Sequence, residues 1–341
     1  MPLISADSLK KRFNLEAGFF ARAGGRFGRF VNAVNDVSFY IDKNESYGLV
    51  GESGCGKTTT ARLLVRMYEA DGGSILYDPG APDAGRVPPE NAGPVDVRGL
   101  RAGALKRYRE KVKYVFQDPA RSLNPRMSVY EVLVSGSRWS SGHGAKAGER
   151  ELREQAAGLL EEVGLSARDL ERKPPEFSGG QRQRISIARG LMMRPDLLIC
   201  DEVVSALDVS VQGQILNLLL DIREKRRLSF LFIAHDLKVA CYFCDRIGVM
   251  YRGRLMEEAP AAELYQRGLH PYTRLLFSSA AGSGVEAPAA ARDIMADNGA
   301  DSADPACAFA RRCPLAEKRC LDGEPDLREI AAGRRIRCFL A

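Results

Sequence analysis

Short apolar runs that end in glycine or polar residues alternate with longer segments of helical period along this chain. Residues 31–50 predict two strands separated by the polar turn from Lys43 to Glu45. The second strand runs directly into the glycine-rich stretch GESGCGKT, after which the period becomes helical. One face of this predicted helix carries Ala61, Leu64, Val65 and Tyr68.

The same alternation continues toward the C-terminus. Apolar runs predict buried strands at residues 112–117, 196–200 and 228–235. Residues 128–173 are predicted to be mostly helical around a polar break, and a further helix is expected between Ser178 and Pro195. Residues 247–258 predict a small hairpin that turns at Arg252 and Gly253.

Buried strands that alternate with helices are typical of an α/β fold with a largely parallel sheet. Ligands of such sheets bind at the carboxyl ends of the strands. Asp201 and His235 each follow a predicted strand, so the sequence places them at this edge.

Two stretches lack an apolar pattern. Residues 78–104 are rich in Pro, Gly and Ala and predict an exposed insertion without a core. Residues 281–305 predict a linker. We therefore expect a main domain over residues 1–280, with a helical subdomain at about 120–195, and a small C-terminal region over 306–341.

The amino-acid composition indicates which class of protein this is. The 341 residues are 45% hydrophobic and 28% charged, which is an ordinary mix for a soluble globular protein. No apolar run reaches the roughly 18 residues that span a bilayer, and the first residues lack the apolar core of a signal peptide. We expect a cytoplasmic protein that can sit against a membrane partner.

The net charge of +6 is concentrated in three clusters, at residues 10–12, 22–29 and 311–337. A solvated face is the simplest interpretation of these clusters, and contact with anionic lipid headgroups is the alternative. Nucleic acid is disfavoured as a partner, because no nucleic-acid-binding motif accompanies the charge.

The stretch from Gly51 to Thr58 matches G-x-x-x-x-G-K-[ST], a phosphate-binding loop. Its glycines let backbone N–H groups surround the phosphates, Lys57 reaches the β- and γ-phosphates, and the Thr58 hydroxyl is a ligand for Mg²⁺. An ordinary glycine turn is the alternative, but a strand before the loop and a helix after it favour the phosphate loop.

Three further side chains complete a candidate hydrolytic site. Asp201 ends an apolar strand and can bind Mg²⁺ through water, while Glu202 can act as a general base toward water. His235 is a candidate γ-phosphate sensor, and the Gln117 amide can contact Mg²⁺ and the attacking water. An isolated Asp-Glu pair is usually a solvated strand end and an isolated histidine is usually structural, so these roles depend on the phosphate loop.

A second candidate phosphate site is the SGGQ stretch at residues 178–181, where a serine and two glycines precede a helix. The N-terminus of a helix offers free N–H groups to an anion. The phosphate loop, VFQD, SGGQ, ICDE, SALD at residues 205–208 and IAHD follow one another in this order along the chain, and together they resemble the nucleotide-binding subunit of an ABC transporter over roughly residues 1–280.

This resemblance implies an ABC-type nucleotide-binding domain, that is, a phosphate-loop RecA-like core with an antiparallel β subdomain and a helical subdomain. Two such domains pair head to tail in the family, so the Ser178–Gly180 loop is expected to cover ATP held by a partner. The nucleotide-contacting residues that it implies are Gly51, Ser53, Gly54, Cys55, Gly56, Lys57, Thr58, Thr59, Asp201, Ser178, Gly179, Gly180, Gln181 and Asp208.

The stretches SLNPR, HPYTRLLFSSA and CAFARRC narrow the resemblance to the F-type ATPase subunit of oligopeptide and dipeptide importers. The adenine-stacking aromatic residue expected for that family is Phe13, with Phe27 and Phe30 as rivals. The family usually has proline after the Asp-Glu pair, and this chain has Val203, from which we expect a slightly looser loop.

The resemblance implies an ATP- and Mg²⁺-dependent ATPase at the cytoplasmic face of the inner membrane. Its implied partners are a second, similar ATPase subunit, two membrane permease subunits and, through them, an external solute-binding protein. Peptides are the expected cargo, and nickel or sugars are alternatives. A soluble ABC ATPase in DNA repair or translation and an iron–sulfur redox or sensor protein remain as competing hypotheses.

Four of the eight cysteines crowd into the C-terminal region, at Cys307, Cys313, Cys320 and Cys338. In a cytosolic chain such crowding favours metal binding over disulfides. The spacing lacks the tight knuckles of structural zinc, so a 4Fe–4S cluster is the expectation, with zinc or unligated thiols as alternatives. The chain's C-x₂-C pair, Cys241 and Cys244, lies in an apolar helical stretch and is interpreted as core packing.

Overall fold

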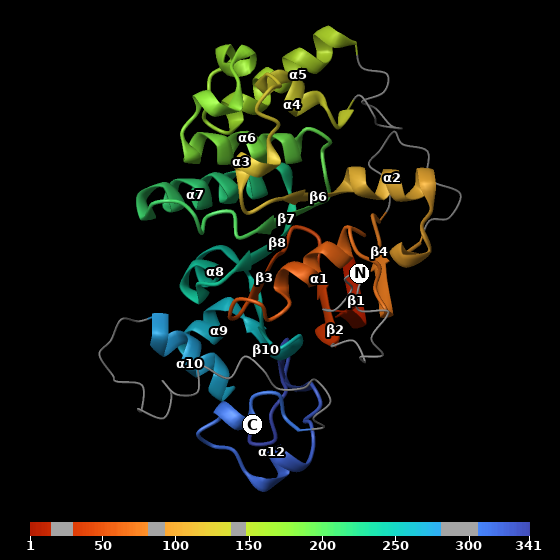
Figure 1. Ribbon diagram of the computed structural model, residues 1–341, viewed down its shortest axis with the longest axis vertical. Coiled ribbons are helices and arrows are strands. Elements are labelled where there is room, and N and C mark those ends of the chain that lie inside the picture. The colour runs from red at the N-terminus through yellow and green to blue at the C-terminus, as the bar shows by residue number, and fades with distance from the viewer. Residues whose placement is uncertain (15–29, 81–92, 138–147, 281–305) are drawn as a thin grey trace, which may run out of the picture.

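The computed structural model describes residues 1–14, 30–80, 93–137, 148–280 and 306–341. Figure 1 shows a group of helices at one end, sheets in the middle and a small C-terminal part at the other end. Three predicted features fall outside the described residues: the linker at 281–305, Phe27, and the polar break near 140–148 except for Gly148.

Five parallel strands form the centre of the larger sheet, in the order β9-β3-β8-β7-β6. They are β3 (Ser46–Val50), β6 (Val112–Val115), β7 (Leu197–Asp201), β8 (Ser229–Ala234) and β9 (Arg246–Tyr251). The strand β10 (Arg254–Pro260) returns antiparallel to β9. The predicted parallel sheet and the predicted hairpin are both confirmed.

A second sheet is antiparallel and has the order β2-β1-β4-β5. Its strands are β1 (Ile4–Asn14), β2 (Phe30–Ile41), β4 (Gly72–Tyr77) and β5 (Val95–Asp96). The two strands predicted within residues 31–50 exist, but β2 belongs to this sheet and β3 to the parallel one. Of the predicted coreless insertion at 78–104, residues 81–92 lie outside the described residues, and the prediction is wrong at Val97, which is fully buried beside this sheet.

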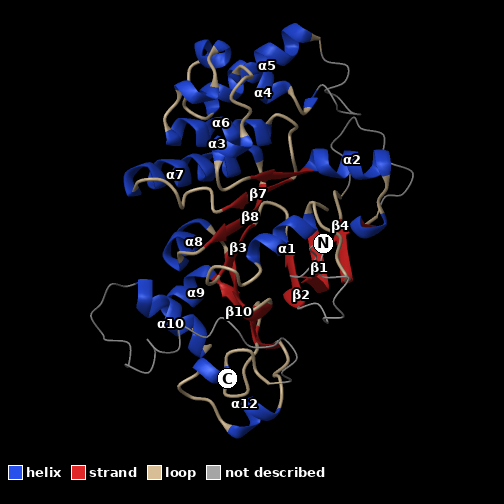
Figure 2. Ribbon diagram, viewed as in Figure 1, coloured by secondary structure: helices blue, strands red, loops and turns tan. Residues whose placement is uncertain are grey.

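Figure 2 shows how the helices cover and extend the parallel sheet. The first helix, α1 (Lys57–Leu64), follows β3 and buries the predicted face at Ala61, Leu64 and, just after its end, Val65. Within the described residues no helix is long and apolar enough to cross a membrane. The other helices of the main part are α2 (Ala102–Lys111), α3 (Pro119–Ser122), α4 (Val129–Val134), α5 (Glu149–Glu162), α6 (Gly179–Leu191), α7 (Val209–Arg226), α8 (Leu237–Phe243), α9 (Ala261–Gln266) and α10 (Pro271–Ala280).

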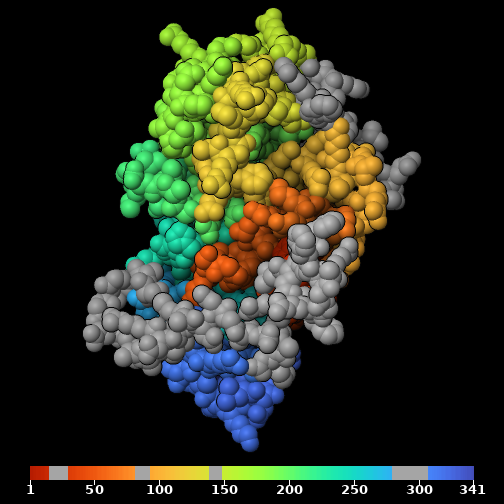
Figure 3. All heavy atoms as spheres, viewed as in Figure 1, coloured from red at the N-terminus to blue at the C-terminus, as the bar shows by residue number. Residues whose placement is uncertain are grey.

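The C-terminal region is joined to the main sheet. Its strand β12 (Arg334–Ile336) pairs antiparallel with β10, and β11 (Arg328–Ala331) pairs with β12. A short helix, α12 (Lys318–Asp322), lies farther out (Figure 1). This region forms the blue lobe at the lower end of the molecule in Figure 3.

Three arginines of this region correct part of the interpretation of residues 311–337 as a solvated or lipid-facing cluster, while Arg311, Arg319 and Arg328 are exposed as expected. Arg334 pairs with Glu257 at 3.1 Å and Arg335 pairs with Glu258 at 2.6 Å, and both carboxylates are almost fully buried. Arg337 is buried as well and pairs with Asp36 of β2 at 3.2 Å. The charges therefore connect the C-terminal region to the main part of the protein.

Candidate nucleotide-binding site

The phosphate loop connects β3 to α1 and is closely packed against its surroundings. A Cβ atom added to Gly51 would lie 2.1 Å from the carbonyl oxygen of Met250, and one added to Gly56 would lie 2.2 Å from that of Ala33. Gly56 also has a φ of 109°, which side chains rarely adopt. These two positions therefore require glycine, as the predicted loop does.

Lys57 begins α1 and is buried within the loop. Its ammonium group donates hydrogen bonds to the carbonyl oxygens of Gly51, at 2.7 Å, and Glu52, at 3.0 Å. Cys55 is buried behind the loop, and burial raises the pKa of its thiol. Ser53 and Gly54 are exposed at the tip, and Thr59 is half-buried in the first turn of the helix.

Two of the side chains predicted to bind Mg²⁺, those of Thr58 and Asp201, meet at the end of β7. The Thr58 hydroxyl donates to one oxygen of Asp201 at 2.9 Å. The phenol of Tyr114 donates to the other oxygen at 2.5 Å, and burial raises the pKa of that phenol, with the Asp201 charge as the second cause. Tyr114 lies on the neighbouring strand β6, and a single tyrosine in an apolar run gave the sequence analysis no reason to select it.

The predicted base and the predicted water-contacting amide are also in contact. The Gln117 side-chain NH₂ donates to a carboxylate oxygen of Glu202 at 2.9 Å. The Glu202 backbone has a φ of 50°, in the left-handed region, and its N–H donates to the carbonyl oxygen of Ile233 on β8. Val203, which stands where the family usually has proline, buries its side chain in the core.

The sheet order explains why these residues meet. Since β3, β8, β7 and β6 are adjacent and parallel, their carboxyl ends lie along one edge. The phosphate loop follows β3, His235 follows β8, the Asp201–Glu202 pair ends β7, and Gln117 follows β6. His235 is exposed at this edge, between the elements that carry Lys57 and Glu202. The phosphate-loop residues and the four predicted strand-end residues thus come from adjacent elements.

The SGGQ stretch lies in a different part of the molecule, at the start of α6 among the helices in the upper part of Figure 1. Ser178 is exposed and caps this helix. Its hydroxyl oxygen accepts the N–H of Gln181, whose side chain accepts the N–H of Ser178. A Cβ atom on Gly180 would lie 2.7 Å from a methyl group of Val211 on α7. Asp208 is exposed at the start of α7.

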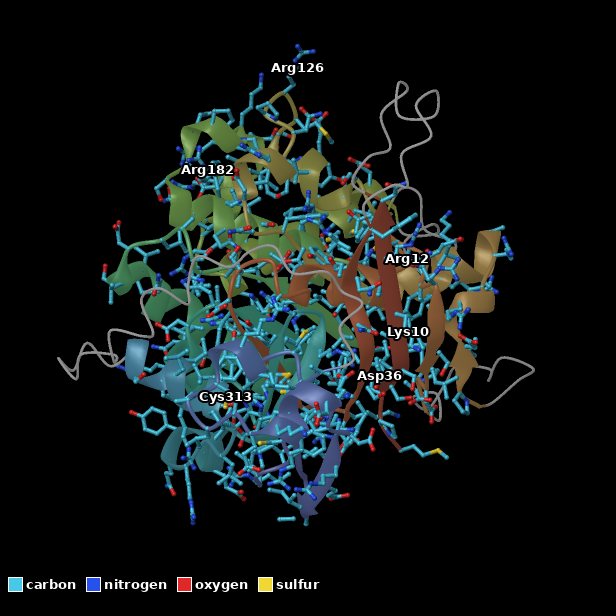
Figure 4. The ribbon with its side chains drawn as sticks, turned by 60° about the horizontal axis from the view of Figure 1, so that its bottom comes forward. Lys10, Arg12, Asp36, Arg126, Arg182 and Cys313 are labelled. Carbon is cyan, nitrogen blue, oxygen red and sulfur yellow. The ribbon has the colours of Figure 1, made fainter. Side chains whose placement is uncertain are left out.

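The aromatic candidates for stacking on adenine differ in their surroundings. Phe13 lies on β1 with its ring edge-on to Tyr68 at 5.3 Å between centroids. Lys11 lies 5.5 Å from the same ring. Phe30 is 46% exposed and has the Arg12 guanidinium 4.4 Å from its ring centroid; Figure 4 shows Arg12 on the same strand as Lys10.

The predicted 4Fe–4S cluster is not supported by the arrangement of the described side chains, none of which form a group of three or more suited to a metal ion. The four C-terminal cysteines are free thiols, and Cys313 is marked in Figure 4. They are nevertheless neighbours: burial raises the pKa of Cys307 and Cys313, and the thiols of Cys320 and Cys338 contribute to both shifts. The interpretation of Cys241 and Cys244 as core packing is confirmed.

Comparisons with known proteins agree with this geometry. Residues 34–205 match the family model described as ABC transporter, and residues 256–320 match the model described as oligopeptide/dipeptide transporter, C-terminal region. A putative peptide import ATP-binding protein of Brucella ovis is 40% identical over 339 residues, which cover 99% of this chain and 98% of that protein. The oligopeptide transport ATP-binding protein OppF of Bacillus subtilis is 47% identical over 249 residues, 73% of this chain and 76% of that protein.

Solved structures share the fold. An ATP-binding cassette crystallised as a dimer in a post-hydrolysis state with ADP and Pi has a TM-score of 0.61 and 24% identity, over 76% of this chain and 98% of that one. A second cassette, in its ADP conformation, has a TM-score of 0.61 and 22% identity, over 82% and 99% of the two chains. The chain therefore belongs to the ABC transporter family of ATP-binding subunits, and it carries the C-terminal region found in oligopeptide and dipeptide transporters.

Proposed function

We propose that this protein is the F-type ATPase subunit that powers import of peptides through a membrane ABC transporter. The observation that carries the proposal is the pair of contacts at one sheet edge, Thr58 with Asp201 and Gln117 with Glu202, beside the phosphate loop. The match of residues 256–320 to the peptide-transporter region and the names of the relatives support peptides as the cargo.

The residues present fit a nucleotide with Mg²⁺. The glycines allow the loop backbone to pack against the carbonyl oxygens of Met250 and Ala33, in the tight turn whose N–H groups would surround the phosphates. The oxygens of Thr58 and Asp201 are the hard ligands that Mg²⁺ prefers. When a nucleotide binds, the Lys57 ammonium group would donate to phosphate oxygens in place of the carbonyl oxygens of Gly51 and Glu52. Bound Mg²⁺ would supply charge neutralisation between the β- and γ-phosphates.

Hydrolysis requires a group that takes a proton from water, and we assign this role to Glu202. The Gln117 amide donates to its carboxylate and holds one oxygen in position, which leaves the other free to accept the proton. His235, which follows the strand between those that precede Lys57 and Glu202, is proposed to donate to the γ-phosphate. In this proposal Phe13 stacks on the adenine, and Phe27 and Phe30 remain the alternatives.

The Ser178–Gly180 loop is proposed to bind ATP held by a second ATPase subunit. Its N–H groups at the start of α6 are those that a helix leaves unpaired, and the Ser178 side chain is exposed. The alternative is that the loop serves this chain's own nucleotide. α6, however, lies among the upper helices and α1 against the sheet (Figure 1).

The protein is proposed to sit at the cytoplasmic face of the membrane, beneath two permease subunits that an external solute-binding protein supplies. The contact surface assigned to the permeases is the segment from Gln117 to Arg126, whose Arg126 is exposed at the outer end of the helical part (Figure 4). A photo-crosslinker on Ser122→Cys should capture permease subunits, and the same probe on Ser278→Cys, exposed on α10, serves as the control.

Peptide uptake tests the function itself. Proteoliposomes that contain both ATPases, both permeases and the binding protein should take up a labelled peptide only with ATP. Uptake of nickel or a sugar instead of the peptide would reject peptides as the cargo, but the assignment as a transport ATPase would stand. An active ATPase that never co-purifies with membrane subunits would favour the soluble ABC ATPase.

The 4Fe–4S cluster is a separate proposal, supported by the four cysteines that the sequence crowds into the C-terminal region and by backbone contacts to three of their sulfurs. The N–H groups of Phe309 and Leu315 donate to Cys307 and Cys313, and that of Leu340 donates to Cys338 at 3.4 Å. Burial, the larger effect, raises the pKa of Cys307 and Cys313, and these donors act in the opposite direction by stabilising the thiolates. Protein purified without oxygen should contain about four irons per chain; stoichiometric zinc, or no metal, would reject the cluster without affecting the ATPase.

A further inference from the structure

Glu52 is the second residue of the phosphate loop, and it places a negative charge beside the proposed site of a nucleotide that is itself strongly negative. The loop pattern leaves this position open to any residue. A carboxylate within a few ångströms of phosphate oxygens opposes their binding, because like charges repel through a medium of reduced dielectric constant. Glu52 must therefore be compensated for the loop to bind ATP well.

The compensating charge comes from the C-terminal region, 260 residues farther along the chain. Arg312 donates to both carboxylate oxygens of Glu52, each at 2.8 Å, in a bidentate pair. The Arg312 side chain is 11% exposed and that of Glu52 is 36% exposed. The hydrogen bonds to Glu52 are the first cause of a raised pKa for Arg312, so the guanidinium stays charged.

Aromatic side chains fix Arg312 in place. Its guanidinium carbon lies 5.4 Å from the ring centroid of Tyr251 and 5.7 Å from that of Phe309. Phe309 is fully buried against Tyr251 and Tyr272, with ring centroids 5.4 and 5.3 Å apart. The Tyr272 hydroxyl in turn accepts the backbone N–H of Glu52 at 3.0 Å. The same cluster therefore holds both the backbone and the side chain of this loop residue.

We infer that Arg312 is a positioning residue for nucleotide binding: it neutralises and orients Glu52 and thereby couples the C-terminal region to the phosphate loop. The coupling passes through a single turn, since Arg312 ends the 3₁₀ helix Ala310–Arg312 between Cys307 and Cys313. This inference rests on the proposed ATP site, and it adds the C-terminal region to the parts that set ATP affinity.

The test removes the positive charge of Arg312 first and the negative charge of Glu52 second. Arg312→Ala leaves Glu52 unpaired, so the Kd for Mg·ATP of the purified full chain should rise roughly tenfold at low ionic strength, and less at high salt. In the assembled transporter KM for ATP should rise with little change in kcat. Adding Glu52→Gln removes the unpaired charge and should return the Kd toward that of the parent. A role in folding alone would give no such rescue.

Two variants complete the design. Arg319→Ala removes an exposed arginine of the same region that is paired with Glu317 at 2.9 Å, and it should leave Kd unchanged. Glu52→Gln alone leaves the Arg312 cation beside the phosphates and should therefore tighten ATP binding. This variant tests the inference even if Arg312→Ala fails to fold. The inference is overturned by an unchanged Kd in Arg312→Ala, by no rescue in the double variant, or by weaker ATP binding in Glu52→Gln. Lys57→Ala serves as the reference that should not bind ATP. If the parent protein binds ATP no better than Lys57→Ala, the proposed function is rejected instead.

Discussion

At the scale of single residues, the proposed chemistry depends most on Glu202. Glu202→Gln keeps the size of the side chain and its contact with Gln117 but removes the charge that accepts a proton. ATPase activity of the assembled transporter should therefore fall by about 10²–10⁴-fold, the usual cost of losing a general base. ATP binding, measured in parallel, should persist. Hydrolysis at the parent rate would reject Glu202 as the base.

The exposed Ser178 tests whether the second loop acts on a partner. Ser178→Arg places a long side chain where a partner's phosphate would approach, while the Lys57 site of the same chain is untouched. Hydrolysis by the paired ATPases should fall by at least tenfold, an estimate for one lost donor and a steric block. ATP affinity at the Lys57 site should stay the same. A collapse of that affinity would show instead that the loop acts within its own chain.

Much of this site could be predicted from the sequence because its motifs are local. The phosphate loop, Asp201, Glu202 and Gln117 each follow a strand, and the parallel order of the strands brings them to one edge. Tyr114 and Arg312 could not be predicted in this way. Their importance arises from contacts with Asp201 and Glu52, and no spacing along the chain encodes a partner 87 or 260 residues away.

At the scale of elements, the turn that begins α10 makes stability depend on pH. His270 is buried, and burial lowers its pKa to about 4, against a smaller opposing effect of Glu257. Its Nδ1 atom accepts the N–H of Tyr272 at 3.0 Å, which requires the unprotonated ring. The unfolded chain binds this proton near pH 6.5, whereas the folded chain resists it down to about pH 4.

The free energy of unfolding should therefore fall as the pH falls from about 6.5 to about 4, by up to roughly 3 kcal/mol from this group alone. Denaturant unfolding at a series of pH values measures the slope. His270→Gln keeps an acceptor without the titration, so its slope should be shallower over the same window. Equal slopes for the parent and the variant would contradict the assignment.

The strand β1 shows why some elements escaped prediction. Its sequence, ISADSLKKRFN, mixes buried and exposed positions without a clean alternation, because register shifts interrupt its pairing with β2 and β4. The pattern of period two that identifies a strand is lost at such irregularities. Strands of the parallel sheet are apolar on both faces, so β7 and β8 were predicted within one or two residues of their observed bounds.

At the scale of the whole molecule, the C-terminal region contributes to the stability of the main sheet. Arg334→Ala should lower the free energy of unfolding by about 3 kcal/mol, since it leaves the buried Glu257 without its arginine partner. The exposed Arg319→Ala should change it by less than about 1 kcal/mol. Chemical denaturation of the two variants makes the comparison. A similar small effect for both would mean that the buried pair adds nothing.

The sequence predicted a small C-terminal region, and the interpretation of its charges did not identify what holds that region in place. Arginine-rich composition was interpreted as solvent-exposed charge because composition carries no information about partners. The partners are Glu257 and Glu258 on β10, which had been expected only as part of a hairpin. Pairing between β12 and β10 is a further link between this region and the rest of the protein.

The attachment of β12 to β10 has a consequence for how the protein is made. β10 leaves the ribosome first, and roughly seventy more residues must be synthesised before β12 exists, which takes about 4–14 s at ordinary rates. During that time β10 is an open sheet edge that carries two carboxylates without their arginines. Open edges are sites of mispairing with other chains, so this is the interval in which a newly made subunit most needs a chaperone.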